Sequence, residues 1–197
     1  GDQSRVSVDL LLDASTSQEE RTELVARQAY ILAESLSALK LPVRVWGYLS
    51  MSGYTVLTRY RDYEEHEKNE EIFRYFTAGA NRDGLAYRAV GELMAEYPSE
   101  RKILIVLSDV TPNDMVKFLY QGQEQAYAGE GAIENAAKEV RAVCASGVTA
   151  LCVYTGDDAG LPAVQRVFGQ NFVKINSLTR FAAAAGRLLE LALSNPA

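Results

Sequence analysis

Residues 6–17 decide the fold, and they read Val-Ser-Val-Asp-Leu-Leu-Leu-Asp-Ala-Ser-Thr-Ser. The apolar run stops at Asp13, and two hydroxyls follow at alternate positions, Ser15 and Ser17. A run this short and this apolar is typical of a strand buried on both faces, as in a parallel sheet. Open α/β sheets bind ligands outside the carboxyl ends of their strands, and we expect these three polar side chains to lie there.

Two interpretations of these polar side chains compete. Carboxylate and hydroxyl oxygens suit Mg²⁺ or Mn²⁺, which are hard cations that prefer oxygen ligands. Alternatively, Ser17 and Glu20 form a capping box, and Thr16 could also cap a helix that begins near Gln18. The rest of the chain has to separate a metal site from a helix cap.

The composition indicates a folded domain and excludes some partners. The 197 residues include 48% hydrophobic side chains, which are enough for a full core, and the formal net charge is -6. An acidic chain without a long basic cluster is not expected to bind nucleic acid. No apolar run reaches the roughly 20 residues of a membrane span. We expect one domain over residues 1–197, belonging to the C-terminal part of a longer protein.

Strands alternate with helices along the chain, which predicts a doubly wound α/β fold. After the first strand we expect a helix with its apolar stripe from Val25 to Leu39, a hairpin of residues 43–51 and 54–60, a helix over 85–97, a strand over 103–107, a helix over 133–145, a strand over 148–154, a helix over 161–168, a strand over 172–175 and a last helix capped by Ser177. The sheet is then six-stranded and mostly parallel, with one antiparallel edge strand and helices on both faces.

Three other features have simple interpretations. The stretch from Phe118 to Gly131 has no clear period and exceeds a usual connection, which is typical of a binding loop. The acidic stretch from Asp62 to Glu71 reads as a solvated loop, and its His66 has no second histidine or cysteine nearby to make a metal site. Cys144 and Cys152 are expected to be small core residues in a reducing compartment.

A second aspartate favours the metal site. The buried run 103–107 ends in Ser108-Asp109, as the first run ends in Asp13. A metal site at one sheet edge predicts this repetition, whereas helix capping does not. Between the two strands, Asn-Arg-Asp-Gly at residues 81–84 opens a helix, and the side chain of Asn81 or Asp83 could point an oxygen into the same site.

The element order and the Asp-x-Ser-x-Ser motif resemble the von Willebrand factor A domain over essentially the whole chain. Members of that family carry a metal-ion-dependent adhesion site. The resemblance implies that Asp13, Ser15 and Ser17 form its first motif and that Asp109 forms its last. Asn81 stands where the family has a threonine, and Asp83 is close enough to replace it, so both remain candidates.

A second departure from the family concerns the loop after Asp109. Val110 stands where the family often has glycine. Because a β-branched residue resists positive φ, we expect this loop to differ in shape from that of the family.

The resemblance also implies a function, which is recognition through Mg²⁺ or Mn²⁺ of a carboxylate donated by a partner protein. The stretches 81–84 and 108–114 look most similar to the cobaltochelatase accessory subunits and the nitric-oxide-reductase activation proteins. That subgroup implies a cytoplasmic helper of an AAA+ ATPase of the MoxR or chelatase type in metal insertion or enzyme activation.

Two other functions compete with this one. In a Mg²⁺-dependent phosphohydrolase Asp13 would be the nucleophile, but the sequence offers no evident general acid or phosphate clamp. A structural domain without a metal is the other alternative.

Overall fold

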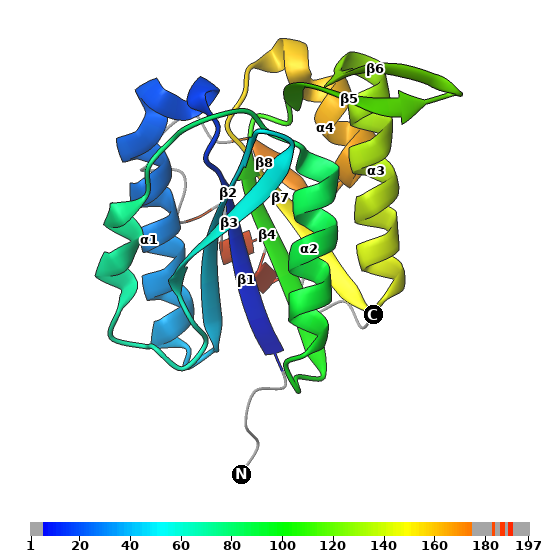
Figure 1. Cartoon of the computed structure of the whole chain (residues 1–197). Coiled ribbons are helices and arrows are strands. Elements are labelled where there is room, and N and C mark those ends of the chain that lie inside the picture. The colour runs from blue at the N-terminus through cyan, green and yellow to red at the C-terminus, as the bar shows by residue number, and fades with distance from the viewer. Residues whose placement is uncertain (1–5, 175–182, 184–185, 188, 191–197) are drawn as a thin grey trace.

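A six-stranded sheet runs through the middle of the molecule, as the computed structural model shows (Figure 1). The structure describes residues 6–174 together with residues 183, 186, 187, 189 and 190. The strand order is β3-β2-β1-β4-β7-β8, and only β2 and β3 pair antiparallel. The strands are β1 (Val6–Asp13), β2 (Val43–Met51), β3 (Tyr54–Arg61), β4 (Arg101–Ser108), β7 (Val148–Tyr154) and β8 (Phe172–Lys174). The predicted mostly parallel sheet with one antiparallel edge strand is confirmed.

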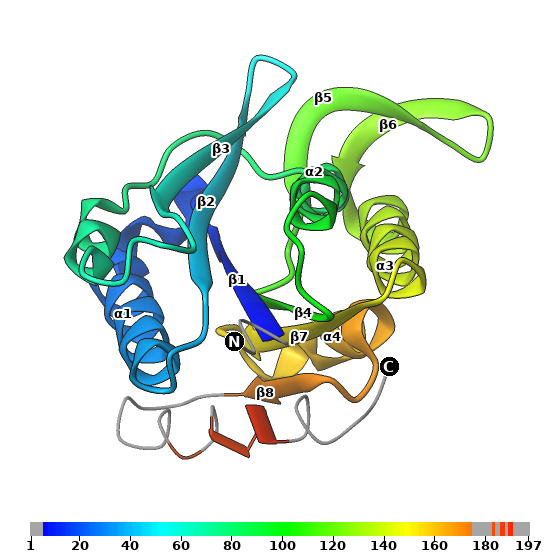
Figure 2. The same ribbon diagram turned by 90° about the horizontal axis from the view of Figure 1, so that it is seen from below.

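Helices cover both faces of this sheet (Figure 2). Helix α1 (Thr22–Ala38) packs on one face, and α2 (Asp83–Ala95), α3 (Gly129–Ala145) and α4 (Leu161–Phe168) lie on the other. Successive side chains of β1 alternate between the two layers, so that Leu10 and Leu12 pack with α1 while Leu11 packs with the opposite helices. All three leucines are completely buried. This double burial explains why the run that opens the chain is continuously apolar.

The beginning of the first helix differs from the prediction. A 3-10 helix, η1 (Thr16–Arg21), precedes α1, which starts only at Thr22. Neither helix has a hydrogen bond from a capping side chain, so the capping box of Ser17 and Glu20 is not formed. The Ser17 hydroxyl lies 3.0 Å from that of Ser15 instead. Two further 3-10 helices are η2 (Asn69–Arg74) and η3 (Asp158–Gly160).

The stretch 118–131 is not the loop that the sequence predicted. It belongs to a hairpin of β5 (Asn113–Tyr120) and β6 (Gln123–Ala128), which forms a separate two-stranded sheet, and to the first turn of α3. The hairpin projects from the top of the molecule in Figure 1, beyond the carboxyl ends of the parallel strands. The consecutive apolar residues Phe118, Leu119 and Tyr120 and the glycines Gly122, Gly129 and Gly131 interrupt the alternation that would identify the two strands.

Three smaller predictions concern the cysteines, the membrane and the last helix. Cys152 is buried as predicted, but Cys144 is exposed on α3, and both thiols are free. Cys144 is therefore wrongly predicted as a core residue. Within residues 6–174 no helix combines the length and the apolar character needed to cross a membrane. The predicted cap at Ser177 and most of the helix after it lie outside the described residues.

Candidate functional site

The loop after β1 is fixed at the carboxyl edge of the sheet by backbone hydrogen bonds. The Ala14 N–H donates to the Tyr48 carbonyl at 2.8 Å, and the Ala78 N–H donates to the Ala14 carbonyl at 2.9 Å. The Thr16 N–H donates to the Gly79 carbonyl at 3.1 Å. The loop is thereby held between β2 and the segment that leads to α2, which places the polar side chains after β1 beside the loop of residues 81–84.

Asp13 and Ser15 form the centre of this loop. The Ser15 N–H and hydroxyl both donate to Asp13 Oδ1, at 2.9 and 2.7 Å. Both residues are buried, whereas Ser17 is exposed with its hydroxyl 3.0 Å from Ser15 Oγ. Asp13 Oδ2 is buried and has no hydrogen-bond partner. One carboxylate oxygen therefore orders the loop, and the other is left without a partner.

Asp83 and Asn81 occupy different roles in the loop before α2. The Asn81 side-chain amide donates to Asp83 Oδ1 at 2.8 Å and to the Thr111 carbonyl at 3.1 Å. Asn81 Oδ1 accepts the Asn113 N–H at 3.2 Å. The amide of Asn81 is thus engaged on both of its atoms, while the fully buried Asp83 keeps Oδ2 without a partner.

Asp109 lies near these two carboxylates. Its Oδ2 accepts a hydrogen bond from the Gln18 side chain at 3.1 Å, and its Oδ1 accepts the Thr111 N–H at 3.2 Å. Burial raises the pKa of Asp13 to about 7, and the negative charge of Asp109 adds to that shift while the Ser15 hydrogen bonds oppose it. Burial and the charge of Asp13 likewise raise the pKa of Asp83 well above its usual range. The three carboxyl groups are therefore electrostatic neighbours.

These groups fit a hydrated divalent cation. Buried polar atoms are normally hydrogen-bonded, yet Asp13 Oδ2, Asp83 Oδ2 and the Tyr48 hydroxyl have no partner at hydrogen-bond distance and angle, and the nearby Ser108 and Tyr48 hydroxyls only partly oppose the raised pKa values of Asp13 and Asp83. Burial, and then the charges of Asp83 and Asp13, raise the pKa of Tyr48, which places its hydroxyl beside both. A cation with its water would satisfy all three atoms. No three Asp, Glu, His or Cys side chains of the described residues are arranged to hold a metal by themselves, so a cation here would also need the serine hydroxyls as ligands.

The loop after Asp109 keeps the conformation that glycine would adopt. Val110 has φ of +52°, although a β-branched residue disfavours the left-handed region. Its N–H donates to the Ser108 hydroxyl at 2.9 Å, and its side chain is buried against the α2–α3 layer. The expectation that Val110 would change the loop's backbone is therefore wrong, because packing holds the residue in a strained conformation.

A cavity of about 220 Å³ opens beside the first loop. Its walls come from the loop after β1, the segment before α2 and the start of β5. The lining residues are Ser15, Thr16, Ser17, Gly79, Ala80, Asn81, Thr111, Asn113 and Met115. None of these residues is basic, so the wall lacks the cationic side chain that would clamp a phosphate.

The hairpin is attached to the Asp83 loop by Tyr127 of β6. The Tyr127 hydroxyl accepts the Gly84 N–H at 3.1 Å and donates to Asn135 Oδ1 at 2.7 Å, and the Arg82 guanidinium lies 5.0 Å from its ring centre. A Cβ at Gly84 would come within 2.1 Å of Asn135 Oδ1, so this close approach requires glycine. At the same base of the hairpin, on β5, Asn113 and Asn81 exchange backbone hydrogen bonds of 3.0 Å.

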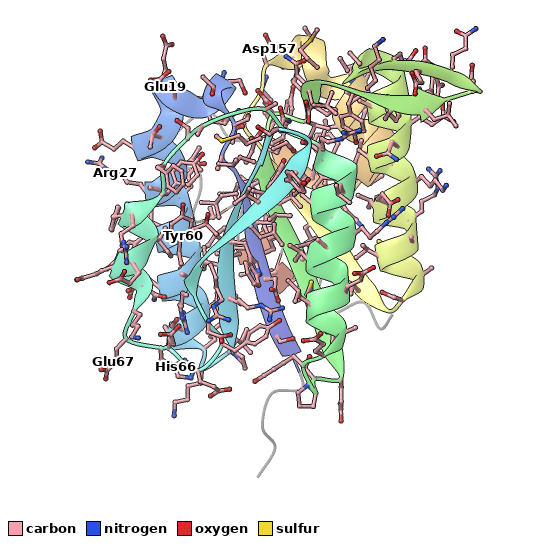
Figure 3. The ribbon with its side chains drawn as sticks, viewed as in Figure 1. Glu19, Arg27, Tyr60, His66, Glu67 and Asp157 are labelled. Atoms are coloured by element: carbon pink, nitrogen blue, oxygen red, sulfur yellow. The ribbon has the colours of Figure 1, made fainter. Side chains whose placement is uncertain are left out.

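The single histidine is remote from this site. Figure 3 shows His66 and Glu67 at the lower end of the molecule, opposite Asp157, which follows β7 at the carboxyl edge. His66 Nδ1 lies 3.2 Å from the buried Arg61 guanidinium, whose other nitrogen donates to Asn69. His66 therefore belongs to a structural cluster and is too far away to serve as a general base for the Asp13 site.

Sequence reasoning missed several residues of the site. Gln18 donates a hydrogen bond to Asp109 and is the buried residue of η1. Nothing in its sequence context distinguishes it from its exposed neighbours. Tyr48 lies within a strand pattern that gives no hint of its buried hydroxyl, and Asn113 and Met115 line the cavity from a strand that was not predicted.

Comparisons with known proteins relate the chain to other proteins through its fold. No protein-family model matches the sequence, and no curated protein matches it. Among solved structures, the pilus adhesin SpaC of Lactobacillus rhamnosus GG in its open conformation matches 98% of this chain and 30% of its own, with 16% identity and a TM-score of 0.66. A mutant of the PilB minor pilin of Streptococcus sanguinis matches 98% of this chain and 64% of its own, with 12% identity and a TM-score of 0.74.

A third solved structure is described as a vWF domain. The vWF domain of the type V pili tip protein Mfa5 of Porphyromonas gingivalis matches 98% of this chain and 97% of its own, with 11% identity and a TM-score of 0.70. The chain thus spans nearly all of that domain but less than two thirds of the SpaC and PilB structures. Identities this low relate the folds alone. The chain has the α/β fold of the von Willebrand factor A-like domains.

Proposed function

We propose that this domain binds other proteins through a divalent cation, Mg²⁺ or Mn²⁺, at the carboxyl edge of the sheet. The observation that carries the proposal is the pair of buried carboxylates, Asp13 and Asp83, each with one oxygen that has no partner. Buried carboxyl groups with raised pKa values are costly to ionise alone, and a cation between them offsets that cost. The Ser15 and Ser17 hydroxyls and Asp109 complete the proposed ligand set.

We assign Asp83 rather than Asn81 as the ligand from the loop before α2. Asn81 uses its amide to position Asp83 and to hold the hairpin, whereas Asp83 keeps a free oxygen. When bound, the cation supplies an electrophilic centre whose waters a carboxylate can replace. The cavity of about 220 Å³ gives the partner's Asp or Glu side chain access from the exposed Ser17 side.

Isothermal titration of Mg²⁺ and Mn²⁺ into the whole chain, with and without an acidic peptide, tests the proposal. We expect saturable binding by the wild-type protein and none by Asp13→Ala. Asp157→Ala is the matched control, because it removes an exposed carboxylate at the same edge and should bind as the wild type does. Wild-type protein that takes up neither ion, even with the peptide present, would refute the metal site.

The wider role follows from the resemblance of residues 81–84 and 108–114 to the chelatase and reductase-activation subgroup. We propose on that ground a cytoplasmic accessory protein whose partner is a MoxR-type AAA+ ATPase or its target enzyme. Retention of a purified ATPase of this type on the immobilised domain, lost with chelator and with Asp13→Ala, would support this role. Mg²⁺-independent retention or none at all would contradict it. The solved structures of similar fold include pilus proteins, so a partner on a cell surface is the alternative to the ATPase.

Binding without catalysis agrees with the remaining geometry. The cavity wall carries no basic residue, and the one histidine lies at the opposite end of the molecule. A phosphohydrolase needs a cationic clamp and a general acid or base near its nucleophile. No observation in the described part of the chain favours that activity.

A further inference from the structure

The β5–β6 hairpin offers an unpaired strand edge beside the candidate metal site. One edge of β5 pairs with β6 along its length. Outside that pairing, among the residues that the structure describes, Asn113 bridges to Asn81 next to the cavity and the Val116 N–H donates to Asp114 Oδ1 at 2.9 Å, while no other strand pairs with this edge. An unpaired edge presents a row of backbone donors and acceptors that can pair with another chain. This edge starts at the cavity and leads away from it.

A bulge turns the side chains of β5 outward next to the cavity. The pairing register shifts between Asp114 and Lys117, so Met115 and Val116 have no partner on β6. Bulges of this kind redirect side chains and occur often beside functional sites. Met115 is 79% exposed and lines the cavity, and Leu119 is 69% exposed further along the strand.

The opposite face of the hairpin is occupied within the molecule. The Phe118 ring packs against Tyr127 at a centre-to-centre distance of 4.8 Å, and the Tyr120 hydroxyl donates to Glu134 of α3 at 2.5 Å. Lys117 and Leu119 alternate with these two residues and therefore point away from α3. The hairpin is thus fixed through one face and presents the other to a partner.

The charge along this edge favours an acidic ligand. Lys117 is exposed between Met115 and Leu119, and it is the only basic residue of the hairpin. Of the two acidic residues in the hairpin, Asp114 is buried, and Glu124 shares the outer face with its partner Leu119 but lies on β6, one strand away from the unpaired edge. A cation in the Asp13 site would offset the charge of its own carboxylate ligands and offer a coordination position to a partner carboxylate, so one acidic contact at the cation and one at Lys117 would be separated by apolar surface.

We infer that an extended acidic segment of a partner protein binds β5 as a third strand, with its first carboxylate at the cation. This inference rests on the proposed function and names its ligand. Along the segment, apolar side chains contact Met115 and Leu119, and a second acidic residue contacts Lys117. Strand addition supplies main-chain hydrogen bonds, and the alternate side chains supply the selectivity.

A phage-displayed library of random 12-residue peptides, panned on the whole domain in Mg²⁺ and eluted with chelator, tests this inference. We expect enriched peptides with two acidic residues separated by alternating apolar positions. A synthetic copy of one such peptide should lose at least tenfold in affinity for Lys117→Glu and for Leu119→Asp. Backbone N-methylation should weaken it only at alternate positions, because every second N–H faces β5.

Matched variants and a separate metal titration keep the outcomes distinct. Lys138→Glu makes the same charge change on the exposed side of α3, and Leu39→Asp makes the same apolar-to-acidic change after α1; both should bind the peptide as the wild type does. Mg²⁺ binding should persist in every variant. Two outcomes would overturn the strand-addition model alone, provided that Mg²⁺ still binds. Either panning enriches no peptide, or the enriched peptides bind Lys117→Glu and Leu119→Asp as they bind the wild type. Absence of Mg²⁺ binding by the wild type would refute the proposed function itself.

Discussion

The side-chain amide of Asn81 donates to Asp83 Oδ1 at 2.8 Å, and it leaves Asp83 Oδ2 buried without a partner. The residue at the family's threonine position therefore orients a neighbouring carboxylate, which presents the free oxygen.

This relationship predicts different effects for the two residues. Asp83→Asn should lower Mg²⁺ affinity by at least tenfold, because it removes the proposed ligand charge while it conserves shape. Asn81→Ser should lower the affinity by less, because Asp83 keeps its charge and loses only an orienting hydrogen bond. Isothermal titration measures both. A larger loss for Asn81→Ser would show that Asn81 is the ligand.

The pH dependence of stability in chelator should report the buried carboxyl groups. The folded-state pKa of Asp13 is raised from 3.8 to about 7, so the folded chain binds more protons than the unfolded chain between these values. Stability should therefore be highest below about pH 4 for this group and decrease as the pH rises towards 7. Asp13→Asn should flatten that decrease and stabilise the protein at pH 8 by roughly 1–3 kcal/mol.

Chemical denaturation at pH 5 and pH 8 measures this effect. Asp157→Asn, which changes an exposed carboxylate at the same edge, is the control and should keep the wild-type slope. Saturating Mg²⁺ should raise stability at pH 8 more than at pH 5, because protons and the cation compete for the same oxygens. An Asp13→Asn variant less stable than the wild type at pH 8 in chelator would contradict the assignment.

Val110 should tolerate glycine unusually well. Val110→Ala keeps the strained φ of +52° and loses buried methyl groups, whereas Val110→Gly loses the same packing but relieves the strain. Elsewhere glycine is less stable than alanine by roughly 0.5–1 kcal/mol. Here Val110→Gly should be at least as stable as Val110→Ala in thermal unfolding. The same pair at Val106, a buried strand residue, should show the ordinary order with alanine the more stable.

Tyr127→Phe should destabilise the domain by about 1–2 kcal/mol. The substitution leaves the buried Gly84 N–H and the Asn135 side chain without their common partner, and an unsatisfied buried group costs about this much. Tyr54→Phe removes a hydroxyl from a tyrosine that is 75% exposed and should change stability by less than about 0.5 kcal/mol. Equal denaturation midpoints for the two variants would show that the Tyr127 hydroxyl does not fasten the hairpin.

The sheet was predictable because its signals are strong and local. The apolar run of β1, the Ser52-Gly53 turn and the strand of Cys152 all define their own structure. The hairpin of β5 and β6 was not predictable in this way, because it lies outside the main sheet. Its inner face contacts α3 and the loop of Gly84, and its outer face is exposed. The sequence predicted that α1 begins near Gln18 with Ser17 as its cap. The Ser17 hydroxyl instead lies 3.0 Å from the Ser15 hydroxyl and caps no backbone N–H, and residues 16–21 form the separate helix η1.

The sequence predicts which candidate residues lie at one sheet edge, but not how Asn81 and Asp83 differ in their hydrogen bonds. Spacing brought Asp13, Ser15 and Asp109 to one edge, since parallel strands end together. The roles of Asn81 and Asp83 depend on Asn113 and Thr111, which are about 30 residues away in a segment whose structure was not predicted.

The two attachments of the hairpin have a thermodynamic consequence. Asn113 and Tyr127 fasten its base to the loop that carries Asp83, so a shift of the hairpin would be transmitted to the proposed cation ligand. A segment that binds β5 and a cation that binds Asp83 then each favour the same arrangement. The segment would then raise the affinity for the cation by some factor. Thermodynamic linkage requires that the cation raise the affinity for the segment by the same factor. If both proposed ligands bind, the domain would respond most strongly when the cation and the segment are present together.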